Sequence, residues 1–382
     1  MIKTADVVII GGGIVGCATA FNLAKRGLKQ VVLLEKGYLA SGSTGRCAAG
    51  IRQQWGTEMN CLLARESIKI FENIREELGG DYDIELNQVG YLIFATTEKE
   101  VAQFKKNIRL QQRLGIPSRL LSPEEVKVIV PHINTEMMMA AAFCQTDGYC
   151  NPFLATLAYG DAARKSGVEI CTYTEVTGIK VEKGKIAGVV TDKGEIATRV
   201  VLNAAGGFAG EIGEMAGVLL PFYPERHQAL VTEPVEPLQT PMVMSFSYNI
   251  YCQQTPHGSF IMGYGDPHEP KSTALNSTWA FLQEIARKVT RVLPEMKDIR
   301  VVRQWAGSYD MTPDRQPILG AIPEVEGFHV AIGFSGHGFM HGPMTGVLMA
   351  EHLLGQETSM KIDMLGVGRF AQGELLLEPS VV

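Results

Sequence analysis

The sequence predicts an α/β fold, α+β over the whole chain, on three observations. An apolar strand runs through a glycine turn into a helix at the start of the chain, over residues 7–26. A similar strand, turn and helix follow near the other end, over residues 328–354. Between them, short strands divided by two hairpin turns occupy residues 168–202. The chain has 382 residues, more than a single core usually holds, so we expect two domains, one inserted into the other.

The first unit has the form of a nucleotide-binding turn. Residues 6–16 read Asp-Val-Val-Ile-Ile-Gly-Gly-Gly-Ile-Val-Gly, a strand that leads directly into a GxGxxG pattern. In such a unit Gly11 allows the tight turn, Gly13 lets the backbone approach a pyrophosphate, and Gly16 lets the helix pack on the strand. The free amides at the helix N-terminus attract the phosphates. The sequence therefore predicts a Rossmann-like domain that binds a dinucleotide.

The residue after the second strand narrows the choice of dinucleotide. Residues 31–34 form that strand, and Glu35 follows at the place of a ribose ligand, with Lys36 beside it. A carboxylate here accepts hydrogen bonds from ribose hydroxyls and repels a 2′-phosphate. NADP is therefore disfavoured, whereas NAD and FAD both fit.

Two later segments favour FAD over NAD. A strand at 200–202 runs into the small residues 203–207, which let the backbone approach a ligand. The strand at 328–332 runs into residues 333–338, Gly-Phe-Ser-Gly-His-Gly, and then into a helix. The positive end of this second helix can stabilise negative charge on a reduced flavin ring. NAD would give that helix no such role.

Composition excludes several classes of protein. The formal net charge is −6, which gives no basic footprint for nucleic acid. The first apolar run, residues 7–10, is too short for a signal peptide, and no long apolar stretch follows, so we expect a cytoplasmic protein without a membrane span. Seven cysteines lie scattered without a C-x-x-C pair, which supports neither a zinc site nor an iron–sulfur cluster.

The remaining segments predict a second domain with an antiparallel sheet. The expected helices are 62–77, 98–114 and 277–293, and the expected strands are 89–95, 228–232, 249–253 and 260–264. In the last helix Leu282, Ile285, Val289 and Val292 share one face. The expected boundaries are 1–80, 145–215 and 322–382 for a discontinuous FAD-binding domain, and 81–144 and 216–321 for a substrate-binding domain.

Several motifs along the chain form one set. They are residues 11–16 with Glu35, 147–148 with 151–152, 204–207, 305–307 with 312–314, and 333–338. With this set the chain resembles the D-amino-acid oxidase type of FAD-dependent amine oxidoreductases, which includes glycine oxidase and sarcosine oxidase. Within the family, the stretches 41–47 and 50–54 look most similar to the β subunits of heteromeric sarcosine oxidases and dye-linked L-proline dehydrogenases.

The resemblance implies a glycine/sarcosine oxidase-like fold with FAD extended between the two domains. The adenosine would meet Glu35 and the backbone near Val176, the pyrophosphate residues 11–16, and the ring residues 43–47 and 336–340. The expected cofactor contacts are Gly11, Gly13, Ile14, Val15, Gly16, Glu35, Lys36, Ser43, Thr44, Arg46, Cys47, Val176, Ala204, Ala205, Gly206, Gly336, His337, Gly338, Phe339 and Met340. No metal site is expected.

The resemblance also implies oxidation of a small amino acid such as sarcosine or proline, with a hydride passing from the amine-bearing carbon to flavin N5. A substrate carboxylate is best held by an arginine fork in a closed pocket. Of Arg52, Arg226 and Arg303, Arg52 ranks first, because similar sarcosine oxidases carry a carboxylate-binding arginine there; a structural ion pair or a phosphate contact is the alternative. Glycine oxidases place an arginine two residues after Trp-Ala-Gly, where this chain has Ser308 and Tyr309, which argues against a glycine oxidase.

Three further side chains are candidate catalytic groups. His337 begins the second glycine-turn helix, where the flavin edge should be, and could act as a general base. Its alternative is to position the backbone and pack beside the ring. His227 and Tyr251 could line the substrate pocket from the inserted sheet, although a lone tyrosine on a strand more often serves packing. His341 is expected to be structural.

Electrons must leave the reduced flavin, and the chain has no second nucleotide fold and no cysteine relay. It uses oxygen directly, as a self-sufficient glycine, sarcosine or D-amino-acid oxidase would, or it uses a partner subunit. The β-subunit resemblance favours a partner with another flavin or an iron–sulfur centre, and Arg46 would then face a second flavin at the subunit interface unless it binds the FAD phosphate. A flavin-bearing assembly subunit without activity and an NAD-dependent dehydrogenase are the remaining alternatives.

Cys47 lies in an otherwise polar glycine loop, next to the expected position of the flavin ring. Some relatives bind flavin covalently through cysteine or histidine. In monomeric sarcosine oxidases the attaching thiol lies a few residues before the segment that resembles 312–314, and this chain has Gly307 and Ser308 there. FAD is therefore expected to bind without a covalent bond, with Cys47 as a contact or an inert thiol.

Overall fold

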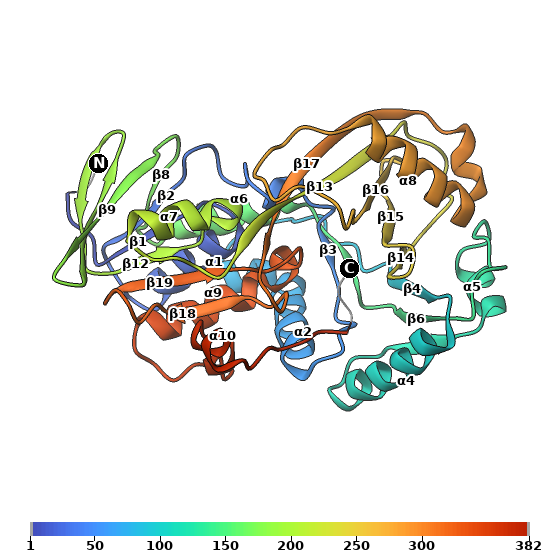
Figure 1. Ribbon diagram of the computed structural model, residues 1–382, viewed down its shortest axis with the longest axis horizontal. Coiled ribbons are helices and arrows are strands. Elements are labelled where there is room, and N and C mark those ends of the chain that lie inside the picture. Colours follow the sequence, from blue (N-terminus) through green and yellow to red (C-terminus); the bar gives the residue numbers. More distant parts are fainter. Residues whose placement is uncertain (1–2, 380–382) are drawn as a thin grey trace.

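A mostly parallel sheet forms one half of the computed structural model, which describes residues 3–379 (Figure 1). Within that range its strands run in the order β18-β19-β12-β1-β2-β8. They are Ile318–Ala321 (β18), Phe328–Ile332 (β19), Val201–Asn203 (β12), Val7–Ile10 (β1), Val31–Leu34 (β2) and Glu169–Cys171 (β8). β1 pairs in parallel with β2 and β12, whereas β18 is antiparallel to β19. The predicted α/β class with a Rossmann-like sheet is confirmed.

The alternation of side chains along β1 gives each face of this sheet its own cover. Val7 and Ile9 point into a core shared with helices, three of which contact the strands of this sheet, and Val8 and Ile10 point into a core under a second, small sheet. The helices are α1 (Ile14–Lys25), α6 (Pro152–Lys165) and α9 (Gly338–Leu353), and the opposite cover is β9 (Val176–Glu182), β10 (Lys185–Thr191), β11 (Gly194–Ala197) and α7 (Ala209–Met215). β9, β10 and β11 form the antiparallel meander that the two hairpin turns predict.

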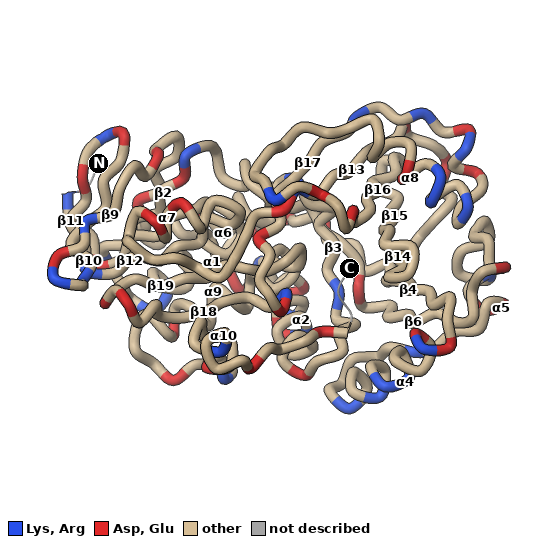
Figure 2. Tube along the Cα trace, viewed as in Figure 1, with Lys and Arg blue, Asp and Glu red and all other residues tan. Residues whose placement is uncertain are grey.

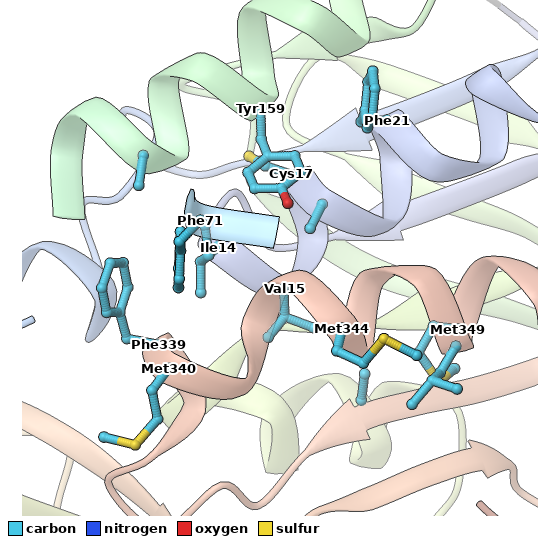
Figure 3. Packing of buried hydrophobic residues seen from close by; sticks show 14 of the residues in the cluster. Ile14, Val15, Cys17, Phe21, Phe71, Tyr159, Phe339, Met340, Met344 and Met349 are labelled. Atoms are coloured by element: carbon cyan, nitrogen blue, oxygen red, sulfur yellow. The ribbon is translucent and has the colours of Figure 1, made fainter. Parts of the chain in front are cut away.

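Helices α1 and α9 begin at the same edge of the sheet, because each follows a parallel strand that pairs with β12. Figure 3 shows the two helices side by side, with Ile14 and Val15 of α1 facing the start and middle of α9. A glycine allows this close approach, since a Cβ at Gly346 would lie 2.5 Å from the Cβ of Ala18. Two helix N-termini, which attract negative charge, thus lie at the carboxyl edge where ligands bind in such sheets.

A second sheet forms the other half of the molecule (Figure 1). In the described residues its order is β17-β13-β16-β15-β14-β4-β6-β5. The strands are Val301–Met311 (β17), Tyr223–Thr232 (β13), Phe260–Tyr264 (β16), Ile250–Gln254 (β15), Met242–Ser245 (β14), Tyr91–Ala95 (β4), Ala140–Cys144 (β6) and Arg119–Leu121 (β5). The sheet is antiparallel as predicted, with one correction: β14 and β4 run parallel.

The second sheet also carries helices on both faces. Leu92 and Phe94 of β4 join a core with α5 (Pro123–Ile129) and α8 (Trp279–Val292). The alternate residues Tyr91 and Ile93 join a core with α4 (Glu98–Arg113). In α8, Phe281 is buried beside Ile285 and Val289, whereas Leu282, expected on that face, is half-buried.

The helix expected over 62–77 is divided. The chain forms α2 (Glu58–Glu72) and α3 (Ile74–Leu78), because Asn73 leaves helical geometry with φ −112° and ψ 28°. Between the large sheets, β3 (Gly50–Ile51) pairs with β7 (Gly148–Tyr149). The remaining elements are the 3₁₀ turns Thr44–Arg46, Gly206–Phe208, Pro294–Asp298 and Asp363–Leu365, and α10 (Gly368–Gln372).

The two large sheets draw on different parts of the chain. The first uses strands between residues 7–34, 169–203 and 318–332, and the second uses strands between 91–144 and 223–311. The predicted boundaries at 80/81, 144/145 and 215/216 fall between these segments, whereas the one at 321/322 places β18 of the first sheet in the substrate-binding part. The division into domains stays a prediction.

Charged residues of both signs fall mainly on outer elements such as α4 and the tips of β10 and β11 (Figure 2). The centre of the molecule, where α1 and α9 meet, is almost free of them in this view. In the part of the chain described, none of the helices has both the length and the apolar character that crossing a bilayer requires.

Candidate active site

A long cavity of about 420 Å³ lies along the carboxyl ends of β1, β2 and β12. The expected cofactor contacts that line it are Gly11, Gly13, Ile14, Val15, Glu35, Lys36, Ser43, Thr44, Arg46, Cys47, Val176, Ala204, Ala205, Gly206, Gly336, Gly338 and Phe339. The structure therefore gathers residues from five distant segments around one space. Gly16, His337 and Met340 do not line it, and the last two line a neighbouring cavity instead.

Glycines keep the turn before α1 narrow. Gly11 has φ +114°, and a Cβ there would lie 2.3 Å from the carbonyl oxygen of Ala204. A Cβ at Gly16 would lie 2.0 Å from the carbonyl oxygen of Gly11. Gly16 thus serves the packing of helix on strand, while Gly13 leaves room for a ligand. The amide of Ile14 donates to Thr44 Oγ1 at 3.2 Å, which ties the loop 41–47 to the start of α1.

Glu35 is held rigidly at the edge of the long cavity. Its Oε2 accepts the amide of Gly12 at 2.8 Å, and its Oε1 accepts the amide of Gly37 at 2.7 Å and the hydroxyl of Ser41 at 3.2 Å. These bonds fix the carboxylate between the first two strands, where ribose hydroxyls can reach it. The ammonium of Lys36 lies over the Phe208 ring, 3.2 Å from its centre. This cation–π contact engages the charge that could otherwise bind a phosphate.

The segment 305–308 of β17 anchors the loop 41–47. Ser43 Oγ donates to the Ser308 carbonyl at 2.5 Å, and Trp305 Nε1 donates to the Arg46 carbonyl at 2.8 Å. The Arg46 guanidinium donates in turn to the carbonyl of Ser41 at 3.2 Å and to that of Ala306 at 3.4 Å. The Trp-Ala-Gly motif therefore has a structural role: it holds the loop that lines both cavities.

A smaller cavity of about 120 Å³ adjoins the long one. Seven residues line both: Ser43, Arg46, Cys47, Ser308, Tyr309, Gly336 and Phe339. All four expected catalytic residues line the small cavity: Arg52, His227, Tyr251 and His337. The sequence did not single out Trp55, Tyr91, Met242 or Met244, which also line it. Their only signal is apolar and aromatic character, which core residues share.

Arg52 follows β3, is buried and lines the small cavity. Its Cζ lies 3.9 Å from the centre of the Trp55 ring, and its Nη1 donates to the carbonyl of Gln54 at 2.9 Å. Burial lowers its pKa, and nearby Tyr91, Glu378 and Asp147 oppose that shift. A buried guanidinium is suited to an anion, because a charge-assisted pair offsets the hydration that burial removes.

Asp147 lies behind Arg52 and holds the segment that carries it. Its Oδ1 accepts the amide of Gln53 at 2.9 Å, and its Oδ2 accepts Nε2 of Gln54 at 3.0 Å. Burial raises the pKa of this carboxyl to about 6, although these hydrogen bonds and Arg52 lower it.

His227, Tyr251 and Tyr309 form a stack in the wall of the small cavity. The His227 ring lies 4.3 Å from the Tyr309 ring and 5.8 Å from the Tyr251 ring, with interplanar angles of 5° and 17°. Burial lowers the pKa of His227 to about 4, so the imidazole is neutral near pH 7. Within residues 3–379 its Nε2 has no hydrogen-bond partner.

His337 is the second neutral imidazole of the small cavity. Burial, followed by the nearby Arg52 charge, lowers its pKa to about 3. Its ring lies 4.9 Å from that of Trp55 and 5.0 Å from that of His341. Among the described residues its Nε2 meets no partner, which leaves this nitrogen for a ligand. His341 is buried but does not line the cavity.

Cys47 lies where the two cavities meet. Its Sγ donates to the Thr44 carbonyl at 3.0 Å and accepts the amide of Ala49 at 3.3 Å. Burial raises the pKa of this thiol to about 12, so it is not a thiolate near neutral pH.

The other two candidate arginines do not reach either cavity. Arg226 forms a half-buried ion pair with Glu269 and donates to Asn276. Arg303 is exposed on β17. Across residues 3–379, no three His, Cys, Asp or Glu side chains come together in a way that could hold a metal ion.

The cradle at Gly11 and Gly13, the fixed Glu35 and the second glycine turn at Gly336 fit a dinucleotide whose reactive ring lies beside the small cavity. This arrangement defines a nucleotide-dependent oxidoreductase. Residues 6–352 match the model of the FAD dependent oxidoreductase family (DAO), and the chain belongs to that family. It is thus an FAD-dependent oxidoreductase, and the resemblance read from the motifs is confirmed.

Known proteins agree with this assignment along the whole chain. The chain is 31% identical to a sarcosine oxidase subunit beta of an Arthrobacter species, over 98% of this chain and 93% of that protein. It is 29% identical to the corresponding subunit of Rhodobacter capsulatus, over 98% and 91%. The crystal structure of L-proline dehydrogenase from P. horikoshii superposes with a TM-score of 0.93 at 39% identity and covers 98% of this chain and 100% of that one.

Proposed function

We propose that this protein oxidises a small secondary or primary amino acid, such as proline or sarcosine, as the catalytic β subunit of a heteromeric complex. The observation that carries the proposal is the small cavity, which joins a buried arginine and two neutral imidazoles to the cofactor cavity. FAD supplies the redox chemistry when bound, by accepting at N5 a hydride from the amine-bearing carbon. The relatives named above support this class of substrate, since their names are those of sarcosine and proline enzymes.

The protein's own residues orient the cofactor. The long cavity supports an extended FAD, with the ribose at Glu35, the pyrophosphate at the turn of Gly11 and Gly13, and the ring between the loop 41–47 and the start of α9. The positive N-terminus of α9 then faces the ring and stabilises negative charge there. We propose that FAD binds without a covalent bond, because Cys47 is a protonated thiol engaged with Thr44 and Ala49.

Arg52 holds the substrate carboxylate in this proposal. Its guanidinium is buried at a cavity lined largely by aromatic and apolar groups such as Trp55 and Met244, which exclude water. A charge-assisted pair in such surroundings orients the substrate as well as binding it. Neither Arg226 nor Arg303 competes for this role, because neither lines the cavity.

His227 and His337 handle the amine. Both are neutral near pH 7, and the Nε2 of each lies buried without a partner in the described residues. With pKa values this low, each imidazole can accept a hydrogen bond from the N–H of the substrate amine, which orients the nitrogen without taking its proton. We assign His337 to this role first, since it immediately precedes α9 beside the proposed ring position, and Tyr251 and His227 to the opposite wall.

The electrons leave through a partner subunit in this proposal. Two curated relatives are named as beta subunits, which supports a heteromeric assembly. Arg46 is available to a second flavin or to the FAD phosphate, because it lines both cavities. Among the described residues its guanidinium donates long hydrogen bonds to two carbonyls, at 3.2 and 3.4 Å. A self-sufficient oxidase that makes peroxide is the alternative enzyme, and an assembly subunit without activity is the alternative outside catalysis.

An anaerobic titration tests the proposal. The purified chain, reconstituted with FAD, is titrated with proline, sarcosine, glycine and D-alanine, and the flavin spectrum is followed before and after air is admitted. We expect one secondary amine to bleach the flavin and the colour to return slowly in air but fast with an artificial dye. Fast recolouring with peroxide would identify a self-sufficient oxidase. A bound flavin that no amine bleaches would favour the assembly subunit, and no flavin binding would contradict the proposal.

A further inference from the structure

The chain after α10 forms a strap, residues 374–379, that crosses from the first sheet to the start of α2 (Figure 1). A buried ion pair fixes its origin: the Arg369 guanidinium donates to Asp314 through Nε at 2.7 Å and through Nη2 at 3.0 Å. The amide of Leu376 donates to the same carboxylate at 3.2 Å. The strap is therefore tied to the segment 312–314, which packs under the glycine turn at Gly333.

Glu378 fixes the other end of the strap. Its Oε1 accepts the amide of Gly56 at 2.7 Å, and its Oε2 accepts the amide of Thr57 at 3.1 Å, the hydroxyl of Thr57 at 2.7 Å and Nδ2 of Asn60 at 2.9 Å. The side chain is buried, and Pro379 packs so close that a Cβ at Gly56 would lie 2.3 Å from its ring. A carboxylate at the N-terminus of α2 is also favoured by the helix dipole.

The clamped residues adjoin the substrate arginine. Trp55 precedes Gly56, and its Nε1 donates to the Arg52 carbonyl at 2.9 Å while its ring lies under the guanidinium. The Trp55 carbonyl accepts Nε2 of Gln111 at 2.7 Å. Arg52, Trp55 and the start of α2 thus form one tight turn, and Glu378 satisfies the amides at its far end. Without Glu378 these half-buried amides would lose their acceptors, which is costly and loosens the turn.

We propose that Glu378 is a positioning residue for substrate binding: by clamping the turn 52–57 through the amides of Gly56 and Thr57, it holds the Arg52 guanidinium at the wall of the small cavity. The inference rests on the proposed function, since it takes Arg52 as the partner of the substrate carboxylate. Glu378 is not among the residues that line the long or the small cavity, so we expect it to act on affinity for a carboxylate and not on the hydride step. Its negative charge, which raises the pKa of Arg52, further favours a charged guanidinium.

The test compares Glu378→Ala with Glu374→Ala in the FAD-loaded full chain. Glu374 lies on the same strap and is exposed, so its removal changes the charge equally but leaves the clamp intact. Acetate serves as the anionic probe and acetamide as its neutral match, each titrated into the oxidised flavin spectrum. We expect Glu378→Ala to weaken acetate by about tenfold, Glu378→Gln by less because one oxygen acceptor remains, and neither to change acetamide.

Hydrogen–deuterium exchange gives a second readout that does not depend on activity. Peptides covering residues 53–61 should exchange at least about tenfold faster in Glu378→Ala than in Glu374→Ala. Unchanged exchange there, or equal loss of acetate and acetamide affinity, would overturn the inference. If Arg52→Lys also leaves acetate binding intact, the carboxylate assignment in the proposed function is wrong, whereas a silent Glu378→Ala beside an impaired Arg52→Lys rejects the clamp alone.

Discussion

The two adjoining cavities differ in the parts of the protein that form them. The long cavity is formed largely by backbone at three strand-to-turn junctions, with glycines at the closest approaches. The small cavity is formed by side chains from β4, β13, β14, β15, β17 and α9, together with Arg52 and Trp55. The first needs local backbone geometry, which a short motif can specify. The second needs the correct register between strands that are far apart in the sequence.

β13 shows how strand register decides which side chains line the small cavity. His227 lies opposite Gly307 of β17, which brings its ring onto that of Tyr309, two residues further along the same strand. Arg226 is the neighbour of His227 on the strand and therefore points to the opposite face, where it meets Glu269. Two adjacent residues thus have unrelated roles, and the choice between them depends on which face of the sheet meets the cofactor.

The largest expected effect comes from a substitution that narrows the long cavity. Gly11→Ala places a side chain 2.3 Å from the Ala204 carbonyl oxygen at φ +114°, so we expect FAD binding to weaken at least about a hundredfold, ~3 kcal/mol. Flavin content after purification and an FAD titration of the apoprotein measure it. Gly27→Ala is the matched control, because Gly27 also has positive φ, +95°, yet a Cβ there meets nothing within 4 Å. Equal loss of FAD in both variants would mean that backbone strain and not the cradle is responsible.

The fold and the cofactor site could be predicted further than the substrate site. The glycine turns at 11–16 and 333–338 specify geometry through glycine itself, so their roles follow from the sequence. Arg52 is predicted only through the family resemblance, and no sequence signal identifies Trp55, which lies under its guanidinium. Tyr309 could not be placed beside His227 without the pairing of β13 and β17. The clamp by Glu378 joins residues more than three hundred positions apart, beyond any local pattern.

The next effect concerns the side-chain cavity alone. Arg52→Lys keeps the charge but loses the planar fork and its stacking on Trp55, so we expect KM for the amino acid to rise roughly 30- to 100-fold, with a smaller change in kcat. Steady-state kinetics with an artificial electron acceptor measure both constants. Arg303→Lys on exposed β17 is the control and should behave as wild type. An unchanged KM in Arg52→Lys would show that Arg52 does not bind the substrate carboxylate. FAD content should be the same in the wild type and in both variants.

A smaller effect concerns the stability of the fold at a histidine pair that lies outside both cavities. His329 of β19 and His352 of α9 meet outside the two linings, with Nδ1 and Nε2 3.1 Å apart. Burial lowers the pKa of His329 from 6.5 to about 4. Between these values the unfolded chain binds a proton here that the folded chain does not, so the free energy of unfolding falls as the pH drops from 6.5 towards 4 and is fully present above that window.

His329→Gln should therefore flatten the pH dependence of stability by about 1.4 kcal/mol per pH unit in that window, without changing FAD or substrate affinity. Urea unfolding at several pH values between 4.5 and 7 measures the slope. The exposed His257→Gln is the control and should keep the wild-type slope. A parallel loss of FAD binding in His329→Gln would show that this pair is coupled to the cofactor cavity after all.

The smallest effect is expected at the junction of the two cavities. Cys47 lines both, but its thiol is protonated and its hydrogen bonds go to the backbone of Thr44 and Ala49. We expect Cys47→Ala to change FAD affinity by less than about threefold, and acid denaturation of the wild type to release all of its flavin. Cys61→Ala is the control, because Cys61 is buried in α2 away from both linings. Flavin retained by denatured wild type but released from Cys47→Ala would reveal a covalent link, and the junction would then be a chemical part of the cofactor site.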